Sequence, residues 1–256
     1  LLFRTIDFKN DPTNNILIGD SRTDALPIEL IENYEKSKYK KLNKNAAKIN
    51  EIFELFYYAN DIKKIDKVVI GINFSMFNKY SYQNRVENTL KIINNPLIYI
   101  FNKTTIEASF YVIRSRLFKI NLNTKPKMSK EEFWKWIIKT KSKHWYAKYK
   151  YPENLYKKLK EFDLFTKNNN TEVIFIVVPH HREFHQKLID YGLEIQEIKF
   201  KETLSSLNAK VYDFDYFNAI IANKNNFKDP IHYNDSIGKL IVNEIWGNKL
   251  LIGKKL

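Results

Sequence analysis

The feature of this sequence that most constrains its fold is a set of short, uninterrupted apolar runs. The clearest occupy residues 16–18, 68–70 and 173–178, and each is bounded by polar or turn-forming residues. Runs of this length predict strands that are buried on both faces, as in a parallel sheet. Weaker strands are expected at 39–42 and 210–214, and segments with helical spacing separate the runs. This alternation predicts a three-layer α/β/α sandwich with a mostly parallel sheet of about five strands.

The alternation stops between positions 85 and 167, and this span is too long for one crossover connection. Apolar residues at helical spacing predict helices over 106–118, 130–140 and 153–165. We therefore expect a single domain over residues 1–256 that carries a helical insertion at 85–167.

Composition excludes several classes of function. The chain has no cysteine, so a disulfide framework, a thiol nucleophile and a Cys-ligated zinc are excluded. Its formal net charge of +14 raises nucleic acid or an anionic surface as partners. The lysines are scattered among Asn and Ile, however, and no zinc-finger spacing, aromatic RNP pattern or basic heptad region is present. We therefore expect no nucleic-acid partner.

Ser21 lies where the first predicted strand runs into a helix. Gly19-Asp20-Ser21-Arg22 follows the apolar run at 16–18 directly, and a helix is expected from about Ala25. In an open α/β sheet, ligands collect at the carboxyl ends of the strands, and a serine there lies near backbone N–H groups that can bind an oxyanion. This position favours a nucleophile, and the alternative is a serine that only caps the helix.

A second candidate element is Asp229-Pro230-Ile231-His232, which precedes the last amphipathic helix. A serine hydroxyl needs a base to take its proton, and the base works best when a carboxylate fixes its tautomer. Asp229 and His232 on one loop can supply both roles. The alternative is a surface turn in which His232 is exposed and has no role.

A third candidate element, Gly71-Ile72-Asn73, follows the apolar run at 68–70. An Asn amide at the carboxyl end of a strand can donate a hydrogen bond to a developing oxyanion, which is worth about 3 kcal/mol in a well-studied protease. The alternative is that Asn73 only ends the strand. Three such elements at three predicted strand or helix ends favour one shared active site.

With these elements the chain resembles the SGNH, or GDSL-like, hydrolase superfamily, whose marker residues are Ser, Gly, Asn and His. Gly19-Asp20-Ser21 is similar to its first block, Gly71-Ile72-Asn73 to its third, and Asp229-Pro230-Ile231-His232 to its last. The resemblance implies a flavodoxin-like sheet, with Ser21 as nucleophile, His232 as base and Asp229 orienting it. It also implies an oxyanion site made by Asn73 and the Ser21 backbone N–H, with Gly71 in the same block.

The chain departs from the family pattern at two places. Residues 42–47 contain no counterpart of the second-block glycine, and Phe74 stands where an Asp usually follows the block-three asparagine. Arg22 after the serine is similar to variants found in proteins of bacterial polysaccharide O-acetylation. An α/β-hydrolase would instead show Gly-x-Ser-x-Gly, which this sequence lacks at Ser21.

Three histidines follow the strongest predicted strand, at positions 180, 181 and 185. His181 and His185 have the spacing of metal ligands on a helix, but Glu183 is not in the metalloprotease position. We therefore expect no metal and no other cofactor. His180 and His181, together with Arg22, are instead expected to line the substrate cleft as binding residues.

These observations predict a serine-dependent acyl esterase or O-acyltransferase that acts on an acylated carbohydrate or surface polysaccharide. The alternative is a catalytically silent glycan-binding module on the same fold. The sequence begins at Leu1 without a Met, which leaves room for a signal or membrane anchor upstream. We expect a bacterial protein of the cell envelope or cell exterior. Whether water or a sugar hydroxyl accepts the acyl group, and the oligomeric state, stay open.

Overall fold

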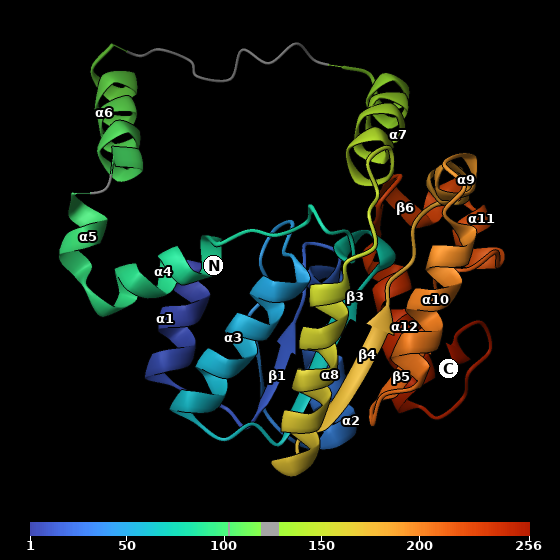
Figure 1. Cartoon of the computed structure of the whole chain (residues 1–256). Coiled ribbons are helices and arrows are strands. Elements are labelled where there is room, and N and C mark those ends of the chain that lie inside the picture. Colours follow the sequence, from blue (N-terminus) through green and yellow to red (C-terminus); the bar gives the residue numbers. More distant parts are fainter. Residues whose placement is uncertain (102, 119–127) are drawn as a thin grey trace.

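A computed structural model describes residues 1–101, 103–118 and 128–256 (Figure 1). Its six-stranded sheet has the order β2-β1-β3-β4-β5-β8. The strands are β1 (Asn15–Ile18), β2 (Tyr39–Lys41), β3 (Lys67–Ile72), β4 (Glu172–Val177), β5 (Lys210–Asp213) and β8 (Lys254–Lys255). Strands β1 to β5 run parallel, and β8 pairs antiparallel with β5. All five predicted strands are confirmed, whereas β8 is too short to leave an apolar pattern.

Helices cover both faces of the sheet, which confirms the three-layer sandwich (Figure 1). One buried apolar cluster includes residues of α1 (Leu2–Asn10), α3 (Ile49–Ile62), α8 (Glu153–Asn168) and α10 (Glu194–Ser205). The other includes residues of α2 (Ile28–Glu35), α11 (Ala219–Ala222) and α12 (Asp235–Trp246). Val68 and Ile70 of β3 lie in the first cluster and Val69 in the second. This alternation is the period of a strand buried on both faces.

The three predicted helices of the segment 85–167 are present. The segment contains α4 (Arg85–Asn94), α5 (Pro96–Ile100), α6 (Lys103–Phe118), α7 (Lys130–Tyr146) and then α8, while residues 102 and 119–127 lie outside the described part. Figure 1 shows α5 and α6 standing away from the sheet, and Phe110 of α6 is 67% exposed. In contrast, α8 lies beside α3 on the same face of the sheet (Figure 1), and the ring centres of Phe162 and Phe53 are stacked 4.7 Å apart. The last helix of the segment is therefore part of the covering layer.

The helix α7 packs against α9 (Arg182–Asp190). Its buried Trp134 donates a hydrogen bond from Nε1 to Glu183 at 3.1 Å and lies edge-on to the His181 ring at 4.9 Å. Helix α7 is thereby fixed beside the segment that follows β4.

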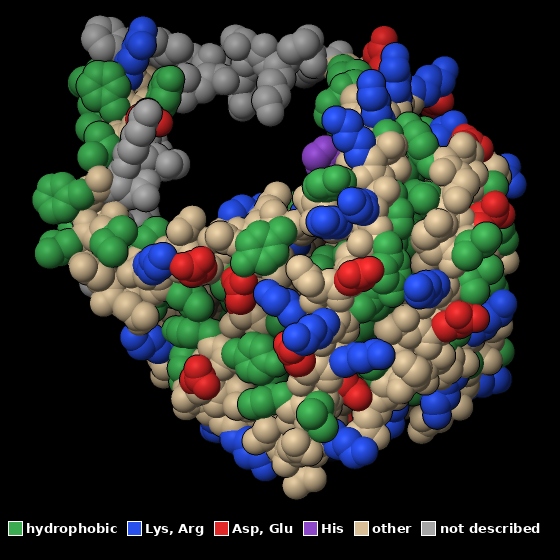
Figure 2. Space-filling model, in the orientation of Figure 1, with side chains coloured by type: hydrophobic (Ala, Val, Ile, Leu, Met, Phe, Trp, Pro, Cys, Tyr) green, Lys and Arg blue, Asp and Glu red, His purple; other side chains and the backbone are tan. Residues whose placement is uncertain are grey.

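Basic side chains are spread over the face seen in Figure 2, with Asp and Glu among them. Elsewhere in the described chain basic residues form ion pairs, as Lys67 does with Glu35 and Glu172 at 2.9 Å each. Within the described ranges, no helix is both long and apolar enough to cross a bilayer. The positive charge is thus distributed over this face and not concentrated in one patch.

Candidate active site

The carboxyl edge of the sheet brings together residues from distant parts of the chain. The segments after β1, β3 and β4 begin with Gly19, Asn73 and Val178, and β1 pairs with β3 while β3 pairs with β4. A short hairpin of β6 (Phe227–Asp229) and β7 (His232–Tyr233) carries Asp229 and His232. The sequence elements expected to form one site therefore meet at one edge.

Ser21, His232 and Asp229 form a hydrogen-bonded chain. Ser21 Oγ lies 2.8 Å from His232 Nε2, and His232 Nδ1 lies 2.7 Å from Asp229 Oδ2. A carboxylate only accepts, so Nδ1 carries the proton and Nε2 is left as the acceptor for the serine hydroxyl. The predicted approach of Ser21 and His232 is confirmed, and its geometry is that of a nucleophile and its base.

The Asp229 carboxylate is held by its own loop. Its Oδ1 accepts the backbone N–H groups of Ile231 and His232 at 2.9 and 3.1 Å. Burial raises the pKa of Asp229, but the His232 hydrogen bond and charge and these two N–H groups outweigh burial, so the pKa lies below its usual value. The loop is also anchored by the His181 backbone N–H, which donates to Pro230 O at 2.9 Å. Asp229 therefore stays ionised and fixed beside the imidazole.

Two donors at the edge have no acceptor among the described residues. Asn73 is completely buried, and its Oδ1 accepts the Ser75 hydroxyl, while its Nδ2 has no hydrogen-bond partner. The backbone N–H of Arg22 is bound to Asp20 Oδ1 at 2.9 Å, whereas the Ser21 N–H has no protein acceptor. An unpaired buried donor such as Asn73 Nδ2 is costly unless it serves a ligand, and a free backbone N–H beside the nucleophile can bind the same oxyanion.

Gly71 lies inside β3 and has a packing role that is visible in the structure. A Cβ placed on Gly71 would lie 2.0 Å from Thr23 Oγ1, and the same is true of Gly19. Thr23 opens the 3₁₀ turn η1 (Thr23–Ala25), two residues after Ser21. Both glycines therefore let the serine turn sit close against β1 and β3, and the oxyanion role of Gly71 stays a prediction.

The segment expected to hold the missing second-block glycine follows β2. Its Lys44 N–H donates to Gly19 O at 3.0 Å, which ties it to the strand end before the serine. Ala46 in this segment has φ +53°, in the left-handed region that favours glycine. The sequence thus places an alanine in a conformation that usually belongs to glycine.

The three residues expected to bind substrate are almost completely buried. Arg22 is 3% exposed, and His180 and His181 are 2% exposed each. The Arg22 guanidinium is paired with Asp20 at 2.5 Å, and its Nη1 lies 2.7 Å from His180 Nε2. These contacts are with the protein itself, and the substrate-binding role stays a prediction.

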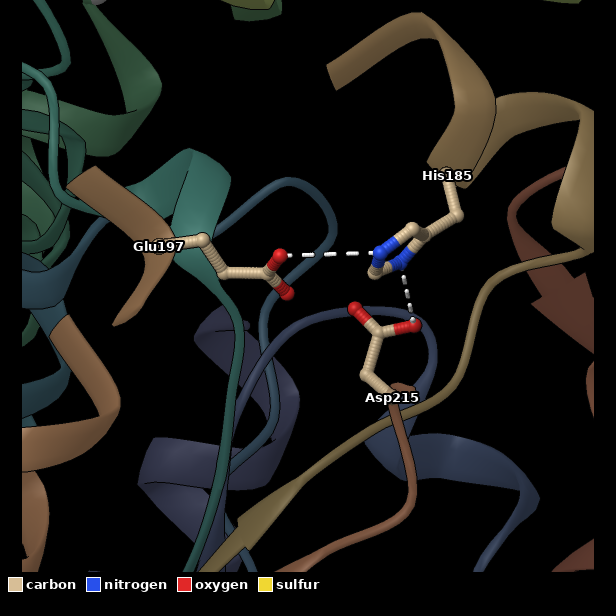
Figure 3. Close-up of side chains that lie close together, drawn as sticks. All are labelled: His185, Glu197 and Asp215. Carbon is tan, nitrogen blue, oxygen red and sulfur yellow. Dashed lines mark ion pairs between the residues drawn. The ribbon is translucent and has the colours of Figure 1, made fainter. Parts of the chain in front are cut away.

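A cluster of His185, Glu197 and Asp215 offers a possible ligand set for a metal (Figure 3). One atom of each lies within 4.8 Å of the others. However, the two ring nitrogens of His185 face different carboxylates, Nε2 toward Glu197 at 3.5 Å and Nδ1 toward Asp215 at 3.7 Å. Lys201 also places its ammonium 3.2 Å from Glu197 Oε1. This arrangement suits a buried ion network better than a metal site, which needs one nitrogen aimed at the shared centre.

Sequence reasoning missed Asp215 and Asp20 as members of the site. Asp215 accepts the His180 ring and backbone N–H groups at 2.8 and 3.0 Å. It comes two residues after β5, at the same carboxyl edge as Ser21. The rule that polar groups gather at this edge would have found it, had it been applied to the weaker strand.

No protein-family model and no curated protein matches the chain. Similar solved structures include a putative lipolytic protein of the G-D-S-L family from Desulfitobacterium hafniense. It is 10% identical to this chain, the alignment covers 93% of this chain and 98% of that chain, and the TM-score is 0.45. A variant of Axe2, an acetylxylan esterase from Geobacillus stearothermophilus, is 12% identical, with 91% and 92% covered and a TM-score of 0.44.

LAE5, an α/β hydrolase enzyme from a Lake Arreo metagenome, is 13% identical, with 92% and 94% covered and a TM-score of 0.46. The chain is thus similar to proteins of the G-D-S-L kind that its motifs resemble. Likenesses at this level carry no argument about function.

Proposed function

We propose that this protein is a serine-dependent acyl esterase or O-acyltransferase. The observation that carries the proposal is the chain from Ser21 Oγ to His232 Nε2 at 2.8 Å and from His232 Nδ1 to Asp229 at 2.7 Å. The side chain of His232 is 31% exposed, so an acyl group can reach the pair from solvent.

In the proposed reaction, the Ser21 oxygen forms a bond to the acyl carbon while its proton passes to His232 Nε2. The bond to the leaving alcohol then breaks, and His232 returns the proton to that oxygen. Water or a sugar hydroxyl next gives its proton to His232 and attacks the acyl carbon of the acyl-enzyme. The bond to Ser21 Oγ then breaks, and His232 returns the proton to that oxygen. Asp229 stays ionised and stabilises the imidazolium in both halves.

The negative charge that develops on the acyl oxygen needs donors. Asn73 Nδ2 and the Ser21 N–H are both without a protein partner within the described chain. Donors fixed before the reaction cost no reorganisation, and one such donor is worth about 3 kcal/mol in a serine protease. We assign both to this oxyanion.

An acylated carbohydrate is the proposed substrate class. Its support is the net charge of +14, which attracts an anionic glycan, and the resemblance of the segment at Arg22 to proteins of polysaccharide O-acetylation. Acetate release from acetylated pectin, which is anionic, should exceed release from acetylated xylan, which is neutral. Equal acetate release from the two polymers would show that the positive charge of the protein does not determine its substrate specificity.

Turnover of p-nitrophenyl acetate tests the chemistry. Ser21→Ala and His232→Ala should each lower kcat by about 10⁴-fold or more, and the double variant should lose no more than either, because triad members act as one unit. Ser206→Ala is a matched control, since this exposed hydroxyl donates to Thr203 O on α10. Full activity of Ser21→Ala would overturn Ser21 as the nucleophile, and a wild-type protein without turnover would favour the silent glycan-binding module.

A further inference from the structure

We propose that His180, Asp215 and Arg22 form a second, buried hydrogen-bonded chain that positions the nucleophile. This inference rests on the proposed function, because it assigns these residues to holding Ser21 in place for attack. None of the three is assigned to contact the substrate.

The first link joins the two residues on either side of the nucleophile. Asp20 and Arg22 are the neighbours of Ser21 in the chain, and Asp20 accepts the Arg22 backbone N–H at 2.9 Å, Nε at 3.0 Å and Nη2 at 2.5 Å. The residues on either side of Ser21 are thus closed into a ring. Burial raises the pKa of Asp20, but the charge and hydrogen bonds of Arg22 outweigh it and lower this pKa. The ring is therefore an ion pair that excludes solvent.

The second link runs from Arg22 to His180. An arginine only donates, so His180 Nε2, 2.7 Å from Arg22 Nη1, must be the acceptor. The proton of the neutral ring then lies on Nδ1, which donates to Asp215 Oδ2 at 2.8 Å. Burial lowers the pKa of His180, in agreement with a neutral ring. The tautomer is therefore fixed by its two partners.

The third link anchors the chain to the fold. Asp215 Oδ1 accepts the His180 backbone N–H at 3.0 Å, and Lys201 of α10 donates to Asp215 O at 2.6 Å and pairs with Asp213 at 2.9 Å. His185 lies between Asp215 and Glu197, 3.7 Å from the first and 3.5 Å from the second (Figure 3). The ends of β1, β4 and β5 are thereby tied to one another through side chains.

A residue of α7 covers the Arg22 end of the chain. Trp145 lies 5.7 Å from the Arg22 guanidinium, measured to the ring centre. A guanidinium in such a place loses most of its water, so removal of one partner leaves a buried charge without compensation. Ser21 is joined to this charge by one peptide bond. A displacement of the nucleophile by 1 Å costs about 100-fold in rate, so the chain acts on kcat.

Two partial replacements of His180 separate the links. His180→Gln places an oxygen near the position of Nε2, so it keeps an acceptor for Arg22. His180→Asn places an amide near Nδ1, so it keeps a donor for Asp215 and loses the contact with Arg22. On p-nitrophenyl acetate, His180→Asn should lower kcat about 100-fold, and His180→Gln should recover most of that loss. KM and the pH profile should stay as in the wild type.

The outcomes distinguish this inference from the proposed function. A wild-type protein without ester turnover overturns the proposed function. The crystal structure of His180→Asn then still tests the chain, because the 2.8 Å contact of Ser21 with His232 should be broken. Equal kcat in the two variants, a rise in KM as the main effect, or an unchanged Ser21 contact overturns the positioning role. If His180→Asn does not fold, Arg22→Lys, which keeps the charge but not the paired donors, should show the same loss of kcat.

Discussion

Two His–Asp pairs of nearly the same geometry lie at the carboxyl edge of the sheet. Asp229 accepts the ring of His232 at 2.7 Å and its backbone N–H at 3.1 Å. Asp215 accepts the ring of His180 at 2.8 Å and its backbone N–H at 3.0 Å. The side chain of His232 is 31% exposed, whereas that of His180 is 2% exposed.

The pairs differ in what faces the far nitrogen of the ring. His232 Nε2 faces the Ser21 hydroxyl, which can give up its proton, and His180 Nε2 faces the Arg22 guanidinium, which does not. The same His–Asp arrangement therefore supplies a base at His232 and a fixed hydrogen-bond acceptor at His180. A His–Asp contact alone does not identify a catalytic pair, and the third partner and the exposure decide its role.

The first prediction tests the two aspartates against each other. Asp229→Asn should lower kcat by about 10⁴-fold, the size of the effect when a serine protease loses this carboxylate. Asp215→Asn should lower kcat far less, but should cost about 3 kcal/mol or more in the free energy of unfolding, because it breaks a buried charged network. Esterase assays and denaturant unfolding measure the two effects. A larger kcat loss from Asp215→Asn would reverse the assignment.

The sequence allowed the pair of His232 and Asp229 to be predicted, but not the pair of His180 and Asp215. The apolar runs predicted the strands because strands buried on both faces need continuous apolar residues. Asp229 and His232 were predicted together because they share one short loop. Asp215 and His180 lie 35 positions apart, and their contact depends on the register of β4 against β5. The left-handed backbone conformation of Ala46 could not be predicted from the sequence either, because it depends on how the segment after β2 packs.

The second prediction concerns pH and the buried histidine. The pKa of His180 is lowered by burial from its ordinary value of 6.5. Below pH 6.5 the unfolded chain binds a proton at this position and the folded chain does not, so the free energy of unfolding falls as pH falls. His180→Gln removes this contribution. Unfolding measured from pH 7.5 to 5 should therefore show a weaker pH dependence in the variant, and an equal dependence would show that folding does not lower the pKa of His180.

The smallest expected effect is at Ala46, which lies in the segment after β2 and belongs to neither pair. Its φ of +53° is strained for alanine, so Ala46→Gly should raise the free energy of unfolding by up to about 1 kcal/mol. The gain is limited by the extra freedom of glycine in the unfolded chain. A loss of stability in thermal unfolding would show that the methyl group packs favourably.

The most direct test of the central claim is covalent labelling of the wild-type protein with a fluorophosphonate, which reacts with an activated serine. We predict one adduct in the intact mass, located on Ser21 by peptide mapping, and no adduct in His232→Ala. The Ser21 oxygen lies 2.8 Å from an imidazole nitrogen. An adduct on another serine, or equal labelling without His232, would contradict the account of Ser21 as the nucleophile and His232 as its base.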